Sequence, residues 1–195
     1  HHPKSVTRTL GLYFLEKGIL IKKGLISPSF GELKNKQMLE WLFGTMTPGP
    51  TEIEEYSQGH EFYFAELSTP IGGAVYLHTL AKAKGIDICC PDISWLDPSL
   101  LEGLTVELYA NGEKKLLTAK GGKMIRIFCP SELDSGDRFL LISLSNEWVA
   151  LKSGHGFSEV ISANKGFFFD GITTRYLLKD LIALAENRIV THRST

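Results

Sequence analysis

The chain is poor in cysteine and lacks the spaced cysteine pairs of a disulfide framework, since it holds only Cys89, Cys90 and Cys129. A zinc site is also disfavoured, because there is no Cys-x-x-Cys pattern and the histidines at 60, 78, 155 and 192 are scattered. His1 and His2 resemble a tag remnant and carry no weight as metal ligands. We therefore expect a protein of a reducing, intracellular compartment.

An excess of one charge sign is missing as well, with 21 Lys plus Arg against 22 Asp plus Glu. No global field would attract the molecule to nucleic acid or to an anionic membrane. No apolar run approaches the ~20 residues that span a bilayer, and the first residues lack the apolar segment of a signal peptide. These absences predict a soluble, cytoplasmic protein without membrane partners. Residues 59–103 are locally acidic, which suits a metal ion or a basic partner better than a nucleic-acid backbone.

What the chain does have is a stretch, residues 60–92, with the order strand, helix, strand. The aromatic run over 62–67 is typical of a half-buried strand. Thr69 can cap a helix that starts at Pro70. Proline suits the first helical position, because a backbone N–H there would have no partner within the helix. The helix is expected to stop at Gly85, and a second strand follows at once. A β-α-β unit over about 61–90 would run both strands parallel in one sheet.

Open α/β sheets bind ligands beyond the carboxyl ends of their strands. In this unit that edge would carry Glu66 and Asp92 together with the ligand-binding candidates Ser68, Thr69, Gly72, Gly73 and Cys90. Free N–H groups in the first helical turn make the edge a candidate seat for a phosphate or carboxylate. No Gly-x-Gly-x-x-Gly or Walker pattern occurs, however. Close packing of the helix on the sheet explains the two glycines better.

The remaining segments complete a single α+β domain over residues 1–195. A hairpin over 10–25 and a helix over 27–44 precede the β-α-β unit, and the acidic stretch 51–58 is expected to form an exposed loop or a short helical turn. From residue 104 the chain predicts an antiparallel β-meander, opened by a tight hairpin at Asn111-Gly112. A terminal helix capped by Asp170 should cover this meander. Subdivision at 1–50, 59–103 and 104–195 is the alternative to one undivided domain.

One motif suggests metal-dependent catalysis. Pro91-Asp92 ends a predicted strand, Glu107 lies on the next, and a lysine lies beyond it. This order resembles the PD-(D/E)XK nucleases over residues 91–115. The resemblance implies Mg²⁺ or Mn²⁺ held by carboxylates, with a lysine that helps to place the attacking water. The residues implied are Asp92, Glu107 and Lys115 (or Lys114) as catalytic groups, with Asp92, Glu107 and Glu66 (or His60) as metal ligands. The lysine expected two residues after Glu107 is absent, a departure from the family pattern.

A second catalytic arrangement would use Cys90 as a nucleophile near the helix N-terminus. His155, on a glycine-flanked loop, would act as the base and Asp92 would orient it. Nothing in the local sequence specifies this arrangement, and a buried cysteine at a strand end is the more common case.

No catalytic signature dominates the chain. The sequence therefore favours a non-enzymatic intracellular module that needs no cofactor and binds another protein within a larger macromolecular assembly. The alternative is a metal-dependent nuclease or hydrolase that uses Mg²⁺ or Mn²⁺, with nucleic acid as its partner. The oligomeric state stays open.

Overall fold

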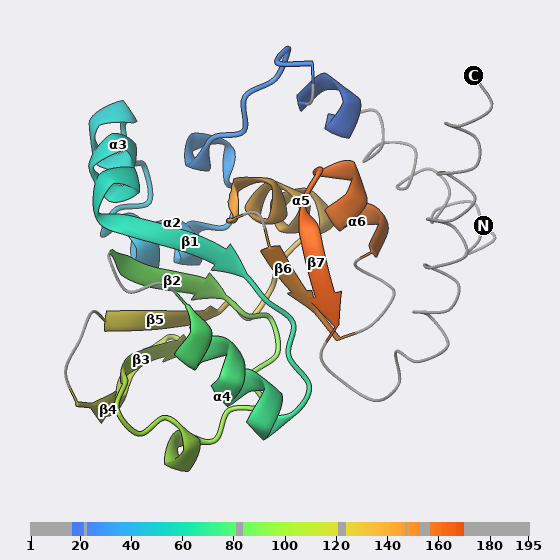
Figure 1. The fold of residues 1–195 in the computed structure, drawn as a ribbon. Coiled ribbons are helices and arrows are strands. Elements are labelled where there is room, and N and C mark those ends of the chain that lie inside the picture. The colour runs from blue at the N-terminus through green and yellow to red at the C-terminus, as the bar shows by residue number, and fades with distance from the viewer. Residues whose placement is uncertain are drawn as a thin grey trace, which may run out of the picture.

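The computed structural model describes residues 17–21, 23–80, 84–120, 124–146, 148–152 and 157–169. Helices lie on both sides of a five-stranded mixed sheet, and a two-stranded sheet adjoins its β1 edge (Figure 1). The predicted α+β class is confirmed.

The larger sheet has the strand order β1-β2-β5-β3-β4. Its strands are β1 (His60–Phe64), β2 (Gly85–Cys89), β3 (Thr105–Ala110), β4 (Glu113–Ala119) and β5 (Met124–Cys129). All run parallel except β4, which pairs antiparallel with β3. The smaller sheet pairs β6 (Trp148–Leu151) with β7 (Gly166–Phe169) in parallel. A parallel bridge between Ala65 and Ala150 places β6 beside the end of β1.

The predicted β-α-β unit is confirmed as β1, α4 (Pro70–Thr79) and β2. The register pairs His60 with Gly85 and Phe64 with Cys89. Thr69 is the N-cap of α4, and Pro70 takes the first helical position, as predicted. The helix ends earlier than expected, at Thr79, and Gly85 is the first residue of β2 rather than the stop of the helix.

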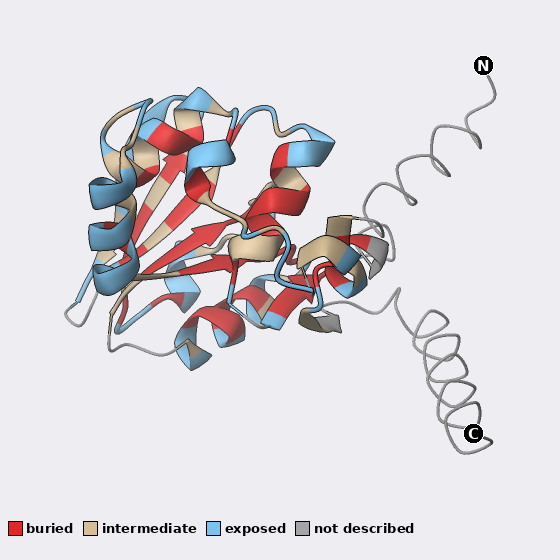
Figure 2. Cartoon of the chain, turned by 90° about the horizontal axis from the view of Figure 1, so that it is seen from above, coloured by how far each residue is buried: buried red, intermediate tan, exposed pale blue. Residues whose placement is uncertain are grey.

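Side chains of alternate strand residues enter two separate cores. One core lies between the sheet and η1 (Phe30–Glu32), α2 (Lys36–Phe43), α3 (Pro50–Gly59), α5 (Ser135–Leu144) and α6 (Phe157–Ser162). The other lies beneath α4 and the β2–β3 connection, which contains Trp95 and η2 (Pro98–Leu100). Figure 2 shows the buried residues gathered on the strands and on the inner sides of the helices.

The predicted meander is wrong beyond its first hairpin. Asn111 and Gly112 do form the tight turn between β3 and β4, with φ of 53° and 73°. However, β5 does not follow β4 in the sheet, because it inserts between β2 and β3 and runs parallel to both. Residues on both sides of position 104 therefore share one sheet.

Residues 138–144, which lie within the predicted meander and were expected to be one of its strands, form most of helix α5. Asp134 caps this helix by accepting a hydrogen bond from the Asp137 N–H at 2.7 Å, so the polar stretch before it is a helix start and not a turn between strands. Four consecutive buried residues, Phe139 to Ile142, fit a buried strand and a buried helix equally well.

The N-terminal region also differs from expectation. Residues 17–21 are helical where a strand was predicted from Gly18, and residues 10–16 lie outside the described part. The predicted helix over 27–44 is divided into η1 and α2, with Ser29 and Asn35 as caps and Gly44 as the expected stop at φ 71°. The acidic stretch forms the ten-residue helix α3. The helix expected after Asp170 lies outside the described residues.

Candidate functional site at the carboxyl edge of the sheet

The strand order creates a topological switch point between β1 and β6. From β1 the chain passes through α4 on one face of the sheet to reach β2, whereas from β6 it passes through α6 on the other face to reach β7. The two strands are neighbours, because Ala65 is bridged to Ala150 and the Glu66 N–H donates to the Ala150 carbonyl at 2.8 Å. Ligands of open α/β sheets bind where adjacent connections diverge in this way. We therefore take the carboxyl ends of β1, β2 and β6 as the candidate site.

On the α5 and α6 side, this edge holds a cluster of one guanidinium and two carboxylates. Arg138 Nη2 donates to Glu66 Oε1 at 2.5 Å, and Arg138 Nε donates to Glu159 at 3.0 and 3.1 Å. The guanidinium also lies 5.1 Å from the centre of the Phe64 ring. The cluster joins the end of β1 to α5 and α6, and its donors are engaged by the chain itself.

Burial sets the titration of this cluster. It raises the pKa of Glu159 above its ordinary value, against the opposing effect of Arg138. Burial alone would lower the pKa of Arg138, but Glu66 and Glu159 hold it above its usual value. The cluster carries two acids against one base, so removal of Arg138 would leave two nearly buried carboxylates facing each other.

On the α4 side, the same edge holds an open ion pair. Lys152, directly after β6, donates to Asp92 Oδ2 at 2.5 Å, and the pair links β6 to the residues after β2 across the end of β1. The side chains of Asp92 and Lys152 are 41% and 30% exposed. The hydrogen bond from Lys152, aided by the Ser94 N–H, lowers the pKa of Asp92 to about 2. This pair is the solvent-accessible charge of the candidate site.

The first turn of α4 was predicted as an anion seat. The Gly72 N–H donates to Thr69 Oγ1 at 3.0 Å, and the Gly73 N–H donates to the Thr69 carbonyl at 2.9 Å. A Cβ on Gly73 would lie 2.0 Å from Trp95 Cε3, so the absence of a side chain there lets the indole pack against the helix. The interpretation that the glycines allow close packing of α4 therefore has direct support, whereas the anion-binding site at its first turn stays a prediction. Ser68 is exposed at the same edge.

Cys90 lies at this edge but is fully buried. Its thiol donates to the Asp92 carbonyl at 3.5 Å. Burial raises the pKa of Cys90 to about 12, so the thiol is protonated at neutral pH. This environment is unlike that of a nucleophilic cysteine, and the proposed base His155 lies outside the described residues.

The residues implied by the nuclease resemblance are placed in different surroundings. Glu107 is nearly buried on β3, where it pairs with Lys114 at 3.1 Å and accepts a hydrogen bond from the Tyr109 hydroxyl. Strand β5 separates Glu107 from the segment that carries Asp92. Glu107 is paired with Arg126 of β5, and Arg126 is paired in turn with Asp87 of β2, five residues before Asp92. Lys115 is exposed on β4. Within the described ranges, no three His, Cys, Asp or Glu side chains come together in a group that could hold a metal ion.

The two remaining metal-ligand candidates also lie apart from one another. Glu66 is bound to Arg138. His60 begins β1, at the opposite end of the strand, and its ring stacks on Tyr56 at 4.7 Å with an angle of 3° between the planes.

Sequence reasoning missed three members of this edge. Arg138 and Glu159 were not recognised because the segments that carry them were not predicted as helices. Lys152 could have been found, because it directly follows the buried run Val149 to Leu151 as a polar residue at a strand end, the same signal that singled out Asp92.

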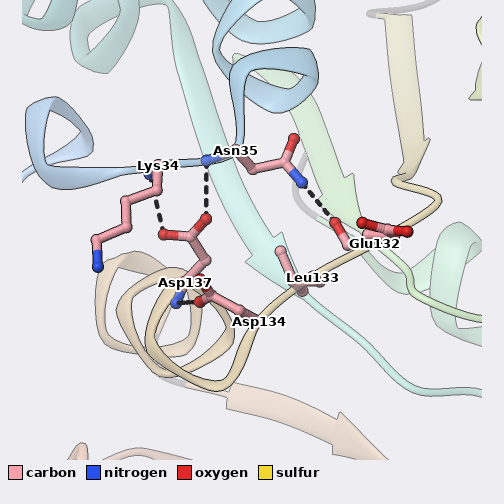
Figure 3. A pocket seen from close by; sticks show the side chains of 6 residues that line it. All are labelled: Lys34, Asn35, Glu132, Leu133, Asp134 and Asp137. Atoms are coloured by element: carbon pink, nitrogen blue, oxygen red, sulfur yellow. Dashed lines mark hydrogen bonds between the residues drawn. The ribbon is translucent and has the colours of Figure 1, made fainter.

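A separate pocket of about 480 Å³ lies where the starts of α2 and α5 meet (Figure 3). Asp137 points toward the chain before α2 and accepts hydrogen bonds from the Lys34 and Asn35 N–H groups at 3.0 and 2.8 Å. Asn35 Nδ2 donates to the Glu132 carbonyl at 2.5 Å. The pocket contains no predicted site residue, and these contacts indicate that its polar groups join two helix starts.

No known protein family, curated protein or solved structure gives a significant match to the chain. In the described part of the chain, no helix combines the length and the apolar character needed to cross a bilayer. What the structure defines is an α+β domain with helices on both faces of a mostly parallel sheet.

Proposed function

We propose that the protein is a non-catalytic docking module that binds another protein through the outer face of α4. The observation that carries the proposal is the exposure of Ile71 and Val75, which are 72% and 57% exposed and lie one helical turn apart. Residues 67–81 contain no Asp, Glu, Lys or Arg. A surface helix normally has a polar outer face, so a helix that is apolar on both sides is typical of a surface that a partner covers.

The apolar surface continues onto the neighbouring η2. Leu100 is partly exposed there, and its carbonyl lies 3.2 Å from His78 Nε2 of α4. We refer to Ile71, Val75 and Leu100 as the α4 surface. Ile71 lies in the first turn of α4, which begins at the carboxyl edge of the sheet, whereas Leu100 lies beside His78 near the end of the helix.

The inner side of α4 makes this surface rigid. Leu77 and Tyr76 are buried beneath the helix, Trp95 packs against Gly73, and Thr69 caps the first turn. A helix held in this way loses little conformational entropy when a partner binds, which favours rigid docking.

The acidic residues near the α4 surface support a basic partner. The β2–β3 connection over residues 90–104 carries Asp92, Asp97 and Glu102 and contains no lysine or arginine, although Asp92 pairs with Lys152 and Glu102 with Lys120 from other segments. An apolar patch with an acidic rim is complementary to an amphipathic helix whose apolar stripe is flanked by Lys or Arg. We therefore propose a basic amphipathic helix of another protein as the partner.

The protein's thiols support an intracellular setting for this role. Cys89, Cys90 and Cys129 are all free, and the first two are buried. Free thiols are typical of a reducing compartment.

The proposal is tested by selecting binders from a display library of helical peptides. The full chain is the target, and the double variant Ile71→Glu, Val75→Glu is the counter-target. We expect selected peptides to share an apolar stripe with basic flanks and to bind the double variant at least about tenfold more weakly, since two carboxylates would be buried at the contact. Titration calorimetry measures the two affinities.

Leu116→Glu is the matched control, because Leu116 is 53% exposed on β4, on another surface. It should bind the selected peptides as the unchanged protein does. A library that enriches no helical peptide, or peptides that bind the double variant equally well, would refute the docking role.

The alternative function, a metal-dependent nuclease or hydrolase, is tested separately. No contact among the described residues favours it over docking. It requires Mn²⁺ to raise the melting temperature in a way that Asp92→Ala abolishes. Such a shift would replace our proposal with the enzymatic one.

A further inference from the structure

A second pocket of about 480 Å³ lies at the amino ends of β6 and β7, away from α4 and the carboxyl edge. Its lining includes the apolar Trp148, Gly166 and Pro28 and the polar Ser143, Asn164 and Lys165. Pockets of this size that combine apolar walls with a few polar groups are typical binding sites for small molecules.

Trp148 is the feature that points to a ligand. It is 58% exposed, whereas Trp95 is 2% exposed and Trp41 is half-buried in the core. An accessible indole presents a large flat apolar surface with a polar N–H, and such side chains are enriched where proteins bind partners.

The ring is held in place by its neighbour in the sheet. Gly166 aligns with Trp148, and a Cβ on Gly166 would lie 2.9 to 3.1 Å from three carbons of the indole. Only a residue without a side chain lets the indole lie this close to β7. The indole is therefore supported by β7 and stays accessible, so a flat ring can stack on it.

The polar part of the pocket is positive. Asn164 and Lys165 lie in the turn between α6 and β7, where Asn164 has φ 58° and the Lys165 N–H donates to the Val160 carbonyl at 3.0 Å. Lys165 Nζ donates to the Ser145 carbonyl at 2.7 Å, which holds the ammonium near the pocket. Among the described residues that line this pocket there is no carboxylate, and Lys165 is the charged one, so an anionic group is favoured over a cationic one.

We propose that this pocket binds a small anion that carries a flat aromatic ring, of the nucleotide type. The ring stacks on Trp148 and the anionic group is attracted by Lys165. The site is independent of the α4 surface, because it lies at the opposite end of the strands and shares no residue with that surface.

Titration of the full chain with AMP and UMP tests the proposal, with adenosine and ribose 5-phosphate as probes that lack one half of the ligand. We expect saturable quenching of tryptophan fluorescence by at least one nucleotide and weaker binding of both partial probes. Trp148→Ala should weaken nucleotide binding about tenfold or more, as loss of a stacking ring does in base-binding proteins. Gly166→Ala should weaken it as well, because the new methyl group displaces the indole.

Two variants separate the site from the rest of the molecule. Lys165→Gln should weaken binding of the nucleotide severalfold while leaving adenosine unchanged. The Ile71→Glu, Val75→Glu variant should bind nucleotide as the unchanged protein does, so failure of the docking proposal and failure of this one are distinguishable. Absence of saturable quenching and of calorimetric heat with every probe at millimolar concentration would overturn the proposal. Equal nucleotide affinity in Trp148→Ala, with circular dichroism showing an intact fold, would overturn it too.

Discussion

Two aspartates five residues apart, Asp87 and Asp92, show how differently one segment of chain can use the same side chain. Asp87 is fully buried in β2, where Arg126 donates to both of its oxygens at 2.7 and 2.6 Å and the Tyr56 hydroxyl donates at 2.6 Å. Asp92, beyond the strand end, is partly exposed and has one charged partner, Lys152. The Asp87–Arg126 pair is enclosed by protein groups, whereas the Asp92–Lys152 pair is accessible to solvent.

The charge network around Asp87 has more contacts than the pair at Asp92, and these contacts join elements of the fold. The contacts of Asp87 attach α3, through Tyr56, to the centre of the sheet, and Arg126 reaches the Trp41 carbonyl of α2 at 3.4 Å. Burial, followed by the nearby Asp87, raises the pKa of Tyr56, so this hydroxyl stays protonated and continues to donate. The network holds the helical layer on the sheet, whereas the carboxyl edge keeps an accessible ion pair.

The largest effect should come from breaking the buried network. Arg126→Ala leaves the Asp87 carboxylate buried without its charged partner, so we expect the free energy of unfolding to fall by about 3–5 kcal/mol. Urea denaturation followed by circular dichroism measures this change. Replacement of both partners, in Asp87→Leu with Arg126→Met, should recover part of the loss, because no unpaired charge remains but the Tyr56 hydroxyl loses its acceptor.

Lys120→Ala is the control for that experiment. The Lys120–Glu102 pair is exposed on both sides at 3.4 Å, so its loss should leave stability nearly unchanged. If Arg126→Ala were as mild as Lys120→Ala, the structural role of the buried network would be refuted.

A smaller loss is expected at the cluster of Arg138, which is buried less completely than the network of Asp87. Arg138→Ala should cost about 2–3 kcal/mol at pH 7, because Glu66 and Glu159 then face each other without compensation. The folded-state pKa of Glu159 is already above its ordinary value of 4.5 and should rise further in the variant. A raised carboxyl pKa favours the folded state below the unfolded value, and this contribution is lost as the pH rises through the folded value.

The Arg138→Ala deficit, measured against the unchanged protein, should therefore be smaller at pH 4 than at pH 7. Urea denaturation at the two pH values gives the comparison. A deficit that is independent of pH would show that lost packing on Phe64, and not the facing carboxylates, causes the instability.

The sequence predicted those parts of the fold whose signals are local. Thr69 with Pro70, and Asn111 with Gly112, specify a helix start and a turn through their own backbone chemistry, and both are confirmed. The position of β5 between β2 and β3 is not a local property, because it depends on which strands Ile125 and Ile127 meet in the folded chain. Helix α5 was missed since its buried residues are consecutive and have no period to distinguish a helix from a strand.

For the candidate site, sequence reasoning located the edge but only part of its contents. The parallel strands of the β-α-β unit place Glu66 and Asp92 at the carboxyl edge, as predicted. Their basic partners, Arg138 and Lys152, are 72 and 60 residues away along the chain. Pairing over such distances follows from the arrangement of the strands, which no local motif encodes.

The smallest effect should come from the open pair, and it sharpens the contrast with Asp87. Lys152→Ala should lower the free energy of unfolding by no more than about 1 kcal/mol, because both charges remain accessible to water. Since the pKa of Asp92 is lowered to about 2 from 3.8, the pair stabilises the fold above pH 3.8 and loses this contribution as the pH falls toward 2. Denaturation of Lys152→Ala and of the unchanged protein should therefore converge at the acid end of this window. A loss as large as that of Arg126→Ala would show that the Asp92–Lys152 pair stabilises the fold as strongly as the buried network of Asp87. The contrast between an open and a structural aspartate would then be wrong.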